Sequence, residues 1–251
     1  MQALVFAGLL ALCGTSVAVG VKLLRLAQRT QGVPERSLGL FFLLGAGVGF
    51  PLSALSTMAG EWQGVLAALS SVFTGASQVL LFLFTARVFC AGERRGRVGV
   101  ALGLALVAVY VLGTSIAQLT AETPEAMLSA QMTWGGVSLV MSAAAYGWTG
   151  LESLRHHAQH RRRLALGLAD PVVTDRMLLW GLMGLTTLLV ILIDAVLLYT
   201  LGAFARTVAI PLVTCTGGLA VGALLLLAFF PPASYLERVR RQAATAAVPF
   251  A

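Results

Sequence analysis

The sequence predicts an all-α polytopic membrane protein, a single bundle of seven transmembrane helices. Of its 251 residues, 58% are hydrophobic and only 11% are charged, whereas a soluble domain carries about 25% charged residues. The apolar residues gather in long runs, and about 20 such residues are enough to cross the ~30 Å hydrocarbon core of a bilayer. The basic residues form short clusters between these runs, which is typical of membrane topology signals rather than of nucleic-acid binding.

Seven apolar runs can be counted along the chain. They cover about residues 2–22, 37–58, 64–87, 98–118, 132–152, 177–200 and 207–230. No basic residue precedes the first run, and the bulky Leu12 stands before Cys13 where a processing signal has a small residue. We therefore expect a first membrane helix rather than a signal peptide. The seven helices are predicted to form one domain over 1–241, followed by a short cytoplasmic tail over 242–251.

The distribution of basic residues predicts the orientation of the bundle. Sixteen of the 17 Lys and Arg residues fall on one side of the predicted membrane, and only Arg206 falls on the other. Because basic loops stay in the cytoplasm, the N-terminus is expected outside and the C-terminus inside. The chain is thus predicted to be a multi-pass protein of the cytoplasmic (inner) membrane, with the lipid bilayer as its main partner.

Prolines are expected to mark helix starts and bends. Three of them stand at expected helix starts: Pro34, Pro124 and Pro171. Asp170 is a good N-cap for the last of these helices, and Trp180 is expected near headgroup depth one turn or more further on. Pro51 and Pro211 fall inside apolar runs, where the missing N–H and the bulk of the ring usually kink a helix.

Polar residues within the runs fall on single helical faces, because spacings of three and four residues place side chains on one side of a helix. The faces comprise Ser70, Thr74, Ser77 and Gln78 in the third run, Ser138, Ser142, Tyr146 and Thr149 in the fifth, Thr187 and Asp194 in the sixth, and Thr214 in the seventh. In a bilayer such faces turn inward. They predict either a small polar pocket in the outer half of the bundle, or simple packing with hydroxyls bonded to their own helices.

Asp194 is the acidic residue whose place in an apolar run requires an explanation. A carboxylate at the bilayer centre costs roughly 2.5–3.5 kcal/mol on insertion scales, so it needs a partner or a polar cavity. Three interpretations remain open: an ion pair with Arg206, a site for a ligand, ion or proton, or exposure at the interface. If the site binds a small molecule, the expected ligand-binding residues are Asp194, Thr187, Ser70, Thr74, Ser138, Ser142 and Thr214.

The segment after the fifth run is basic. Its arginines are expected to face anionic lipid headgroups: Arg155, Arg161, Arg162 and Arg163. His156 and His160 have the i, i+4 spacing of a metal-binding pair, but the adjacent arginines would repel a cation, so we predict no metal site. The sequence contains no HExxH, GxSxG or phosphate-loop motif, which favours a non-enzymatic protein without a cofactor. The only lysine, Lys22, lies at the end of the first run, which excludes a retinal protein.

The junction LAFFPPASYLERVRR, from Leu227 to Arg241, resembles the exit from the last membrane helix of bacterial seven-helix sensor modules that precede histidine kinases. The resemblance is carried by Phe229, Phe230, Pro231, Pro232 and Tyr235. It implies a receptor-like sensory module that acts through a cytoplasmic or membrane signalling partner, since only ten residues follow Arg241 and they hold no output domain. A small-solute transporter or channel, and a structural subunit of a membrane complex, remain as alternatives.

Overall fold

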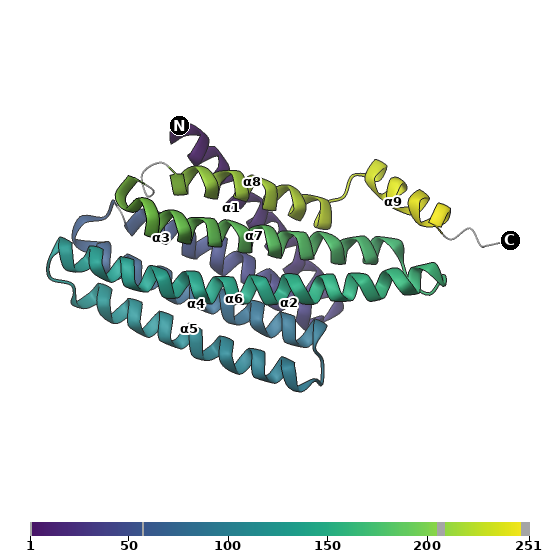
Figure 1. Cartoon of the computed structure of the whole chain (residues 1–251), viewed down its shortest axis with the longest axis horizontal. Helices are drawn as coiled ribbons and strands as arrows, with labels where there is room; N and C mark the ends of the chain where they lie inside the picture. The colour runs from purple at the N-terminus through teal and green to yellow at the C-terminus, as the bar shows by residue number, and fades with distance from the viewer. Residues whose placement is uncertain (1, 57, 205–208, 247–251) are drawn as a thin grey trace.

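The computed structural model describes residues 2–56, 58–204 and 209–246, and it contains helices but no strand over these residues (Figure 1). The elements are α1 (Gln2–Thr30), α2 (Val33–Phe42), the π-helix η1 (Leu43–Gly49), α3 (Phe50–Ser56), the 3₁₀-helix η2 (Gly60–Trp62), α4 (Gln63–Phe89), α5 (Arg94–Thr120), α6 (Pro124–Ala165), α7 (Pro171–Phe204), α8 (Ile210–Phe229) and α9 (Ala233–Ala246). The all-α prediction is confirmed.

Six segments among the described residues are long and apolar enough to cross a membrane. They are Leu10–Thr30, Val33–Ser56, Gly60–Phe89, Arg94–Thr120, Pro171–Leu201 and Ile210–Phe229. Each contains or overlaps one of the predicted runs, so the chain is built as a multi-pass membrane protein. The segments are 20 to 31 residues long, so each reaches the length that crosses the hydrocarbon core.

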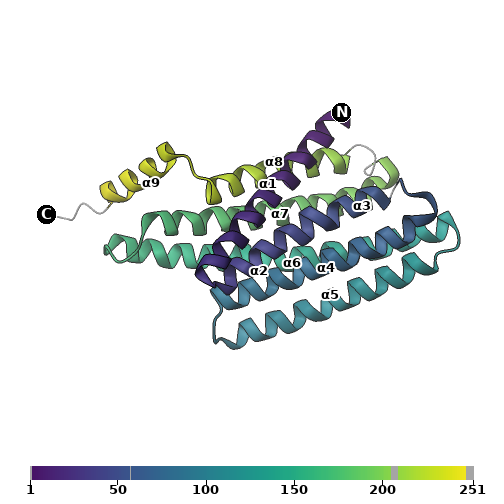
Figure 2. The same cartoon turned by 180° about the vertical axis from the view of Figure 1, so that it is seen from behind.

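The predicted fifth run lies in α6, which is not among these six segments. At 42 residues, α6 is the longest helix, and it runs well beyond 132–152 in both directions. It is nevertheless one of the packed helices of the bundle, because it lies along α7, α5 and α4 and runs roughly parallel to them (Figures 1 and 2). Its position in the bundle is thus that of a helix among spanning helices.

The second apolar segment contains a π-helix, η1, between two α-helical parts. The backbone N–H of Phe50 bonds to the carbonyl of Gly45, five residues earlier. Pro51 follows at once and has no N–H to give to Gly47, while its ring would crowd that carbonyl in an ordinary α-turn. The predicted disturbance at Pro51 therefore takes the form of a widened turn just before it.

The helix starts agree with the predictions for Pro34, Pro124 and Pro171, each of which lies in the first turn of its helix. Asp170 accepts a hydrogen bond on Oδ1 from the backbone N–H of Val172 at 2.7 Å, as expected of a cap. Pro211 is the second residue of α8, and Ala209 just before this helix has π-helical geometry. Because residues 205–208 lie outside the described part of the chain, the kink predicted at Pro211 stays a prediction.

Aromatic and small residues pack the helices against one another in the interior of the bundle. Trp180 is buried between Phe84 and Phe229, with ring centroids 5.7 Å away in each case, so its side chain faces the core and not the lipid. Helices α6 and α7 cross very closely at Gly150 and Gly184. A Cβ on Gly184 would lie 2.8 Å from the Gly150 Cα, so only glycine permits this approach.

After Pro231 and Pro232 the chain forms α9, which the apolar runs do not predict because half of its residues are polar or charged. The helix projects from the end of the bundle in both views (Figures 1 and 2) and contacts only the start of α7 among the helices with substantial contacts. The Tyr235 hydroxyl donates to Asp175 Oδ2 at 2.8 Å. Burial and the adjacent Asp175 carboxylate raise the pKa of Tyr235 to about 12, so the hydroxyl keeps its proton and the tether at neutral pH.

Candidate ligand-binding cavity

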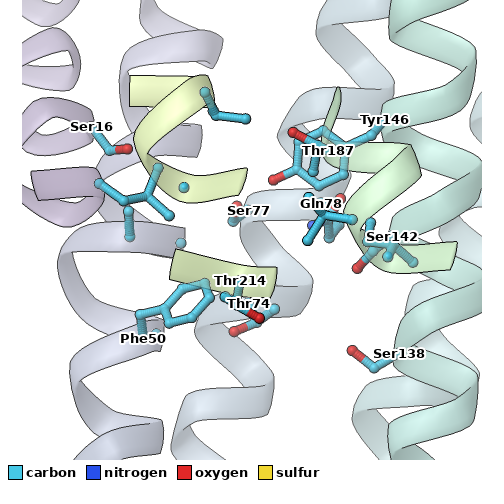
Figure 3. A pocket seen from close by; sticks show the side chains of 18 of the residues that line it. Ser16, Phe50, Thr74, Ser77, Gln78, Ser138, Ser142, Tyr146, Thr187 and Thr214 are labelled. Carbon is cyan, nitrogen blue, oxygen red and sulfur yellow. The ribbon is translucent and has the colours of Figure 1, made fainter. Parts of the chain in front are cut away.

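A cavity of about 380 Å³ lies between the helices, and all seven predicted ligand-binding residues line it. Ser70 and Thr74 come from α4, Ser138 and Ser142 from α6, Thr187 and Asp194 from α7, and Thr214 from α8. The labelled side chains in Figure 3 gather around this one space. The structure therefore brings together the polar faces that the sequence predicts, although binding itself stays a prediction.

The cavity includes the residues expected in the outer half of the bundle and extends from them toward the middle of the predicted spans. On α7 its wall runs from Met183 to Asp194, which is the middle of the predicted span 177–200. The polar faces continue inward beyond the seven residues, through Gln78 on α4 and Tyr146 on α6, whose side chains lie against each other. Because Gln78 and Tyr146 also line the cavity, it reaches the middle of the bundle.

The π-helix forms a wall of the cavity, and this part of the site is not predicted from the polar faces. Gly45, Ala46 and Gly49 line the space with little or no side chain. A Cβ on Gly45 would lie 2.7 Å from Ser77 Oγ, so glycine lets η1 pack tightly on α4. The Ser70 hydroxyl donates to the Gly49 carbonyl at 2.9 Å, which satisfies a carbonyl at the irregular end of the π-helix. The combination of Pro51 with the Gly45/Gly49 spacing was the available sequence signal.

Some of the predicted hydroxyls are bonded within the protein. The Thr187 hydroxyl donates to the Met183 carbonyl one turn earlier at 2.9 Å, which is the self-bonding that the packing interpretation predicts. The polar faces thus combine the two alternatives, packing and a pocket, that the sequence left open. They pack against one another, and they still leave a cavity between them.

Asp194 is half-buried at one end of the cavity wall. Its Oδ2 accepts a hydrogen bond from the Thr214 hydroxyl at 3.2 Å, which joins α7 to α8. Its Oδ1 is buried and accepts no hydrogen bond from any residue that the structure describes. Arg206, the predicted ion-pair partner, lies in the segment 205–208 outside the described residues, so that ion pair stays a prediction.

A second buried carboxylate, Glu152, was missed by the sequence analysis because it stands at the end of the fifth run. Its side chain is 2% exposed, and Oε1 accepts hydrogen bonds from Arg155 at 2.8 Å and Arg95 at 3.3 Å. Arg95 also pairs with Glu93, and that hydrogen bond lowers the pKa of the Glu93 carboxyl. The cluster joins α6 to the start of α5, and it lies apart from the cavity wall.

The basic segment of α6 differs in part from its predicted role. Arg161, Arg162 and Arg163 are exposed, as a surface for lipid headgroups requires. Arg155 instead forms an ion pair with Glu152 on the same helix, so its side chain does not serve the lipid headgroups alone. His156 Nδ1 lies 3.0 Å from the Glu152 carbonyl, and the described residues contain no group of three metal-binding side chains.

Comparison of the chain with protein-family models, with curated proteins and with solved structures finds no match.

Proposed function

We propose that this protein is a non-catalytic, receptor-like sensory module of the cytoplasmic membrane that binds a small molecule in the central cavity. The observation that carries the proposal is the cavity itself. Its volume of about 380 Å³ is near the lower end of the ~300–1,000 Å³ range of small-molecule sites. Its wall is mostly apolar with a few converging polar groups, which is the usual composition of such sites.

The proposed topology has seven spanning helices, with α6 as the fifth span, the N-terminus outside and the C-terminus in the cytoplasm. The sixteen basic residues on one side support this orientation. The packing of α6 among α4, α5 and α7 supports the seventh span, because a helix in that position follows the same path as its neighbours.

A receptor fits the packing better than a transporter does. Inward of the cavity, Leu81 and Phe82 of α4 are at most 3% exposed, and the buried hydroxyls of Thr85 on α4 and Thr149 on α6 bond to each other at 2.7 Å. A solute pathway would need a polar route through this layer, whereas a receptor needs only a closed site. Helix α8 lines the cavity and leads directly to α9, which supplies a connection from the site to the cytoplasmic side.

A thermal-unfolding screen of the purified protein in detergent micelles tests the proposal. The probes are small neutral, cationic and anionic compounds, and a ligand at one hundred times its Kd stabilises the folded state by about 2.7 kcal/mol. We expect a subset to raise Tm, and we expect proteoliposomes containing the protein not to accumulate those compounds. Accumulation would assign a transporter instead, and a screen in which no compound raises Tm would contradict ligand binding.

A further inference from the structure

The wall of the cavity is acidic. Among the described residues that line it, Asp194 is the only one that carries a formal charge, and none is Lys, Arg or His. An anionic ligand would therefore meet a carboxylate with no compensating positive charge in a medium of low dielectric constant. A cationic ligand would supply the counter-charge that this carboxylate lacks among the described residues.

Two acceptors at the cavity wall have no donor. They are Oδ1 of Asp194 on α7 and Oε1 of Gln78 on α4, both buried and both without a hydrogen bond from the described residues. Gln78 is only 4% exposed, so bulk water does not satisfy it. Buried polar atoms in native proteins nearly always have a partner, and both of these atoms require a hydrogen-bond donor.

The other residues of the cavity wall indicate which kind of ligand supplies this hydrogen-bond donor. Phe41 and Phe42 of α2, Phe50 of α3, Tyr110 of α5 and Tyr146 of α6 line the cavity from several sides. In Figure 3, Phe50 and Tyr146 lie on different sides of the space. Aromatic rings accept an apolar body and, through their faces, also attract a cation.

We propose that the cavity binds a small organic amine in its ammonium form, with the nitrogen at Asp194 and an apolar body between the aromatic side chains. An ammonium group offers donors and no acceptor, which matches the unsatisfied Oδ1 of Asp194. The Thr214 hydroxyl, which already donates to Oδ2, fixes the carboxylate so that Oδ1 is left for the ligand. This assignment rests on the proposed function, since it names the ligand class of the same site.

The test compares three probes of similar shape on the full chain in detergent micelles at constant salt: phenethylamine, 2-phenylethanol and 3-phenylpropionate. We expect phenethylamine to raise Tm most, the alcohol less and the carboxylate least. In Asp194→Asn the affinity for the amine should fall by about ten- to hundredfold, because a hydrogen bond to a charged group is lost, and the alcohol should bind almost as before. Thr214→Val keeps the charge and should weaken the amine less than Asp194→Asn does.

The outcomes separate the ligand class from the proposed function. Equal or stronger binding of the alcohol or the carboxylate, unchanged by Asp194→Asn, would overturn the amine and leave the cavity as a ligand site. If Asp194→Asn does not fold, the order of the three probes on the unaltered protein decides the same question. Absence of binding by all three probes, together with a negative result in the broader compound screen, would overturn both proposals.

Discussion

Glu152 shows how a buried carboxylate can be held by groups that remain near solvent. The side chain is 2% exposed, whereas those of Arg95 and Arg155 are 45% and 61% exposed. If Glu152 is replaced by a neutral residue, Arg95 and Arg155 stay charged, and water or lipid headgroups can solvate them. Removing the arginines leaves a charge that is buried without a partner, and such a charge is far more costly.

This asymmetry gives a prediction for the free energy of unfolding in detergent. The pair of changes Arg95→Gln and Arg155→Gln should lower it by about 3 kcal/mol, whereas Glu152→Gln should lower it by about 1 kcal/mol. Adding Glu152→Gln to the double variant should recover part of the loss. Reversible unfolding in mixed micelles measures each value.

Glu237→Gln is the matched control, because it breaks an ion pair between two exposed side chains, Arg241 and Glu237. Its effect should stay below about 1 kcal/mol. A Glu152→Gln variant that is less stable than the double arginine variant would show that the carboxylate is held by something other than these two arginines.

At the scale of helices, the sequence predicts the apolar interior of each element much better than its ends or its irregular turns. The apolar runs locate the spans because hydrophobicity is a local property. The π-turn before Pro51 is different, since its form depends on the packing of Gly45 and Gly49 against α4. The apolar run 132–152 covers only the middle of α6, because the residues that continue this helix at both ends are largely polar.

The same helix provides a topological prediction. If α6 crosses the membrane, a reporter fused after Glu122, in the α5–α6 connection, should report the outside. A reporter fused after Gly167, between α6 and α7, should report the cytoplasm. Paired enzyme reporters with opposite compartment requirements measure both positions. Two reporters on the same side would contradict the seventh span and reduce the count to six.

At the scale of the whole molecule, the candidate site was predictable because the polar residues keep helical spacing on three helices, and Thr214 adds a polar residue on a fourth. Such faces had to turn inward, and the structure places all seven predicted residues around one cavity. The contributions of α1 and α2 to the wall could not be predicted, because Ser16 and Phe41 carry no local signal of a site. Which faces meet is decided by the arrangement of the helices.

The central claim, that this cavity is the ligand site, is tested most directly by filling it. Ser142 lines the cavity, whereas Val140 lies on the outer side of the same helix and is 59% exposed. Ser142→Phe should abolish the rise in Tm caused by compounds that bind the unaltered protein, because the new ring occupies their space. Val140→Phe, of similar bulk but facing away from the core, should leave that rise intact. Equal stabilisation of both variants by the same compounds would contradict the account.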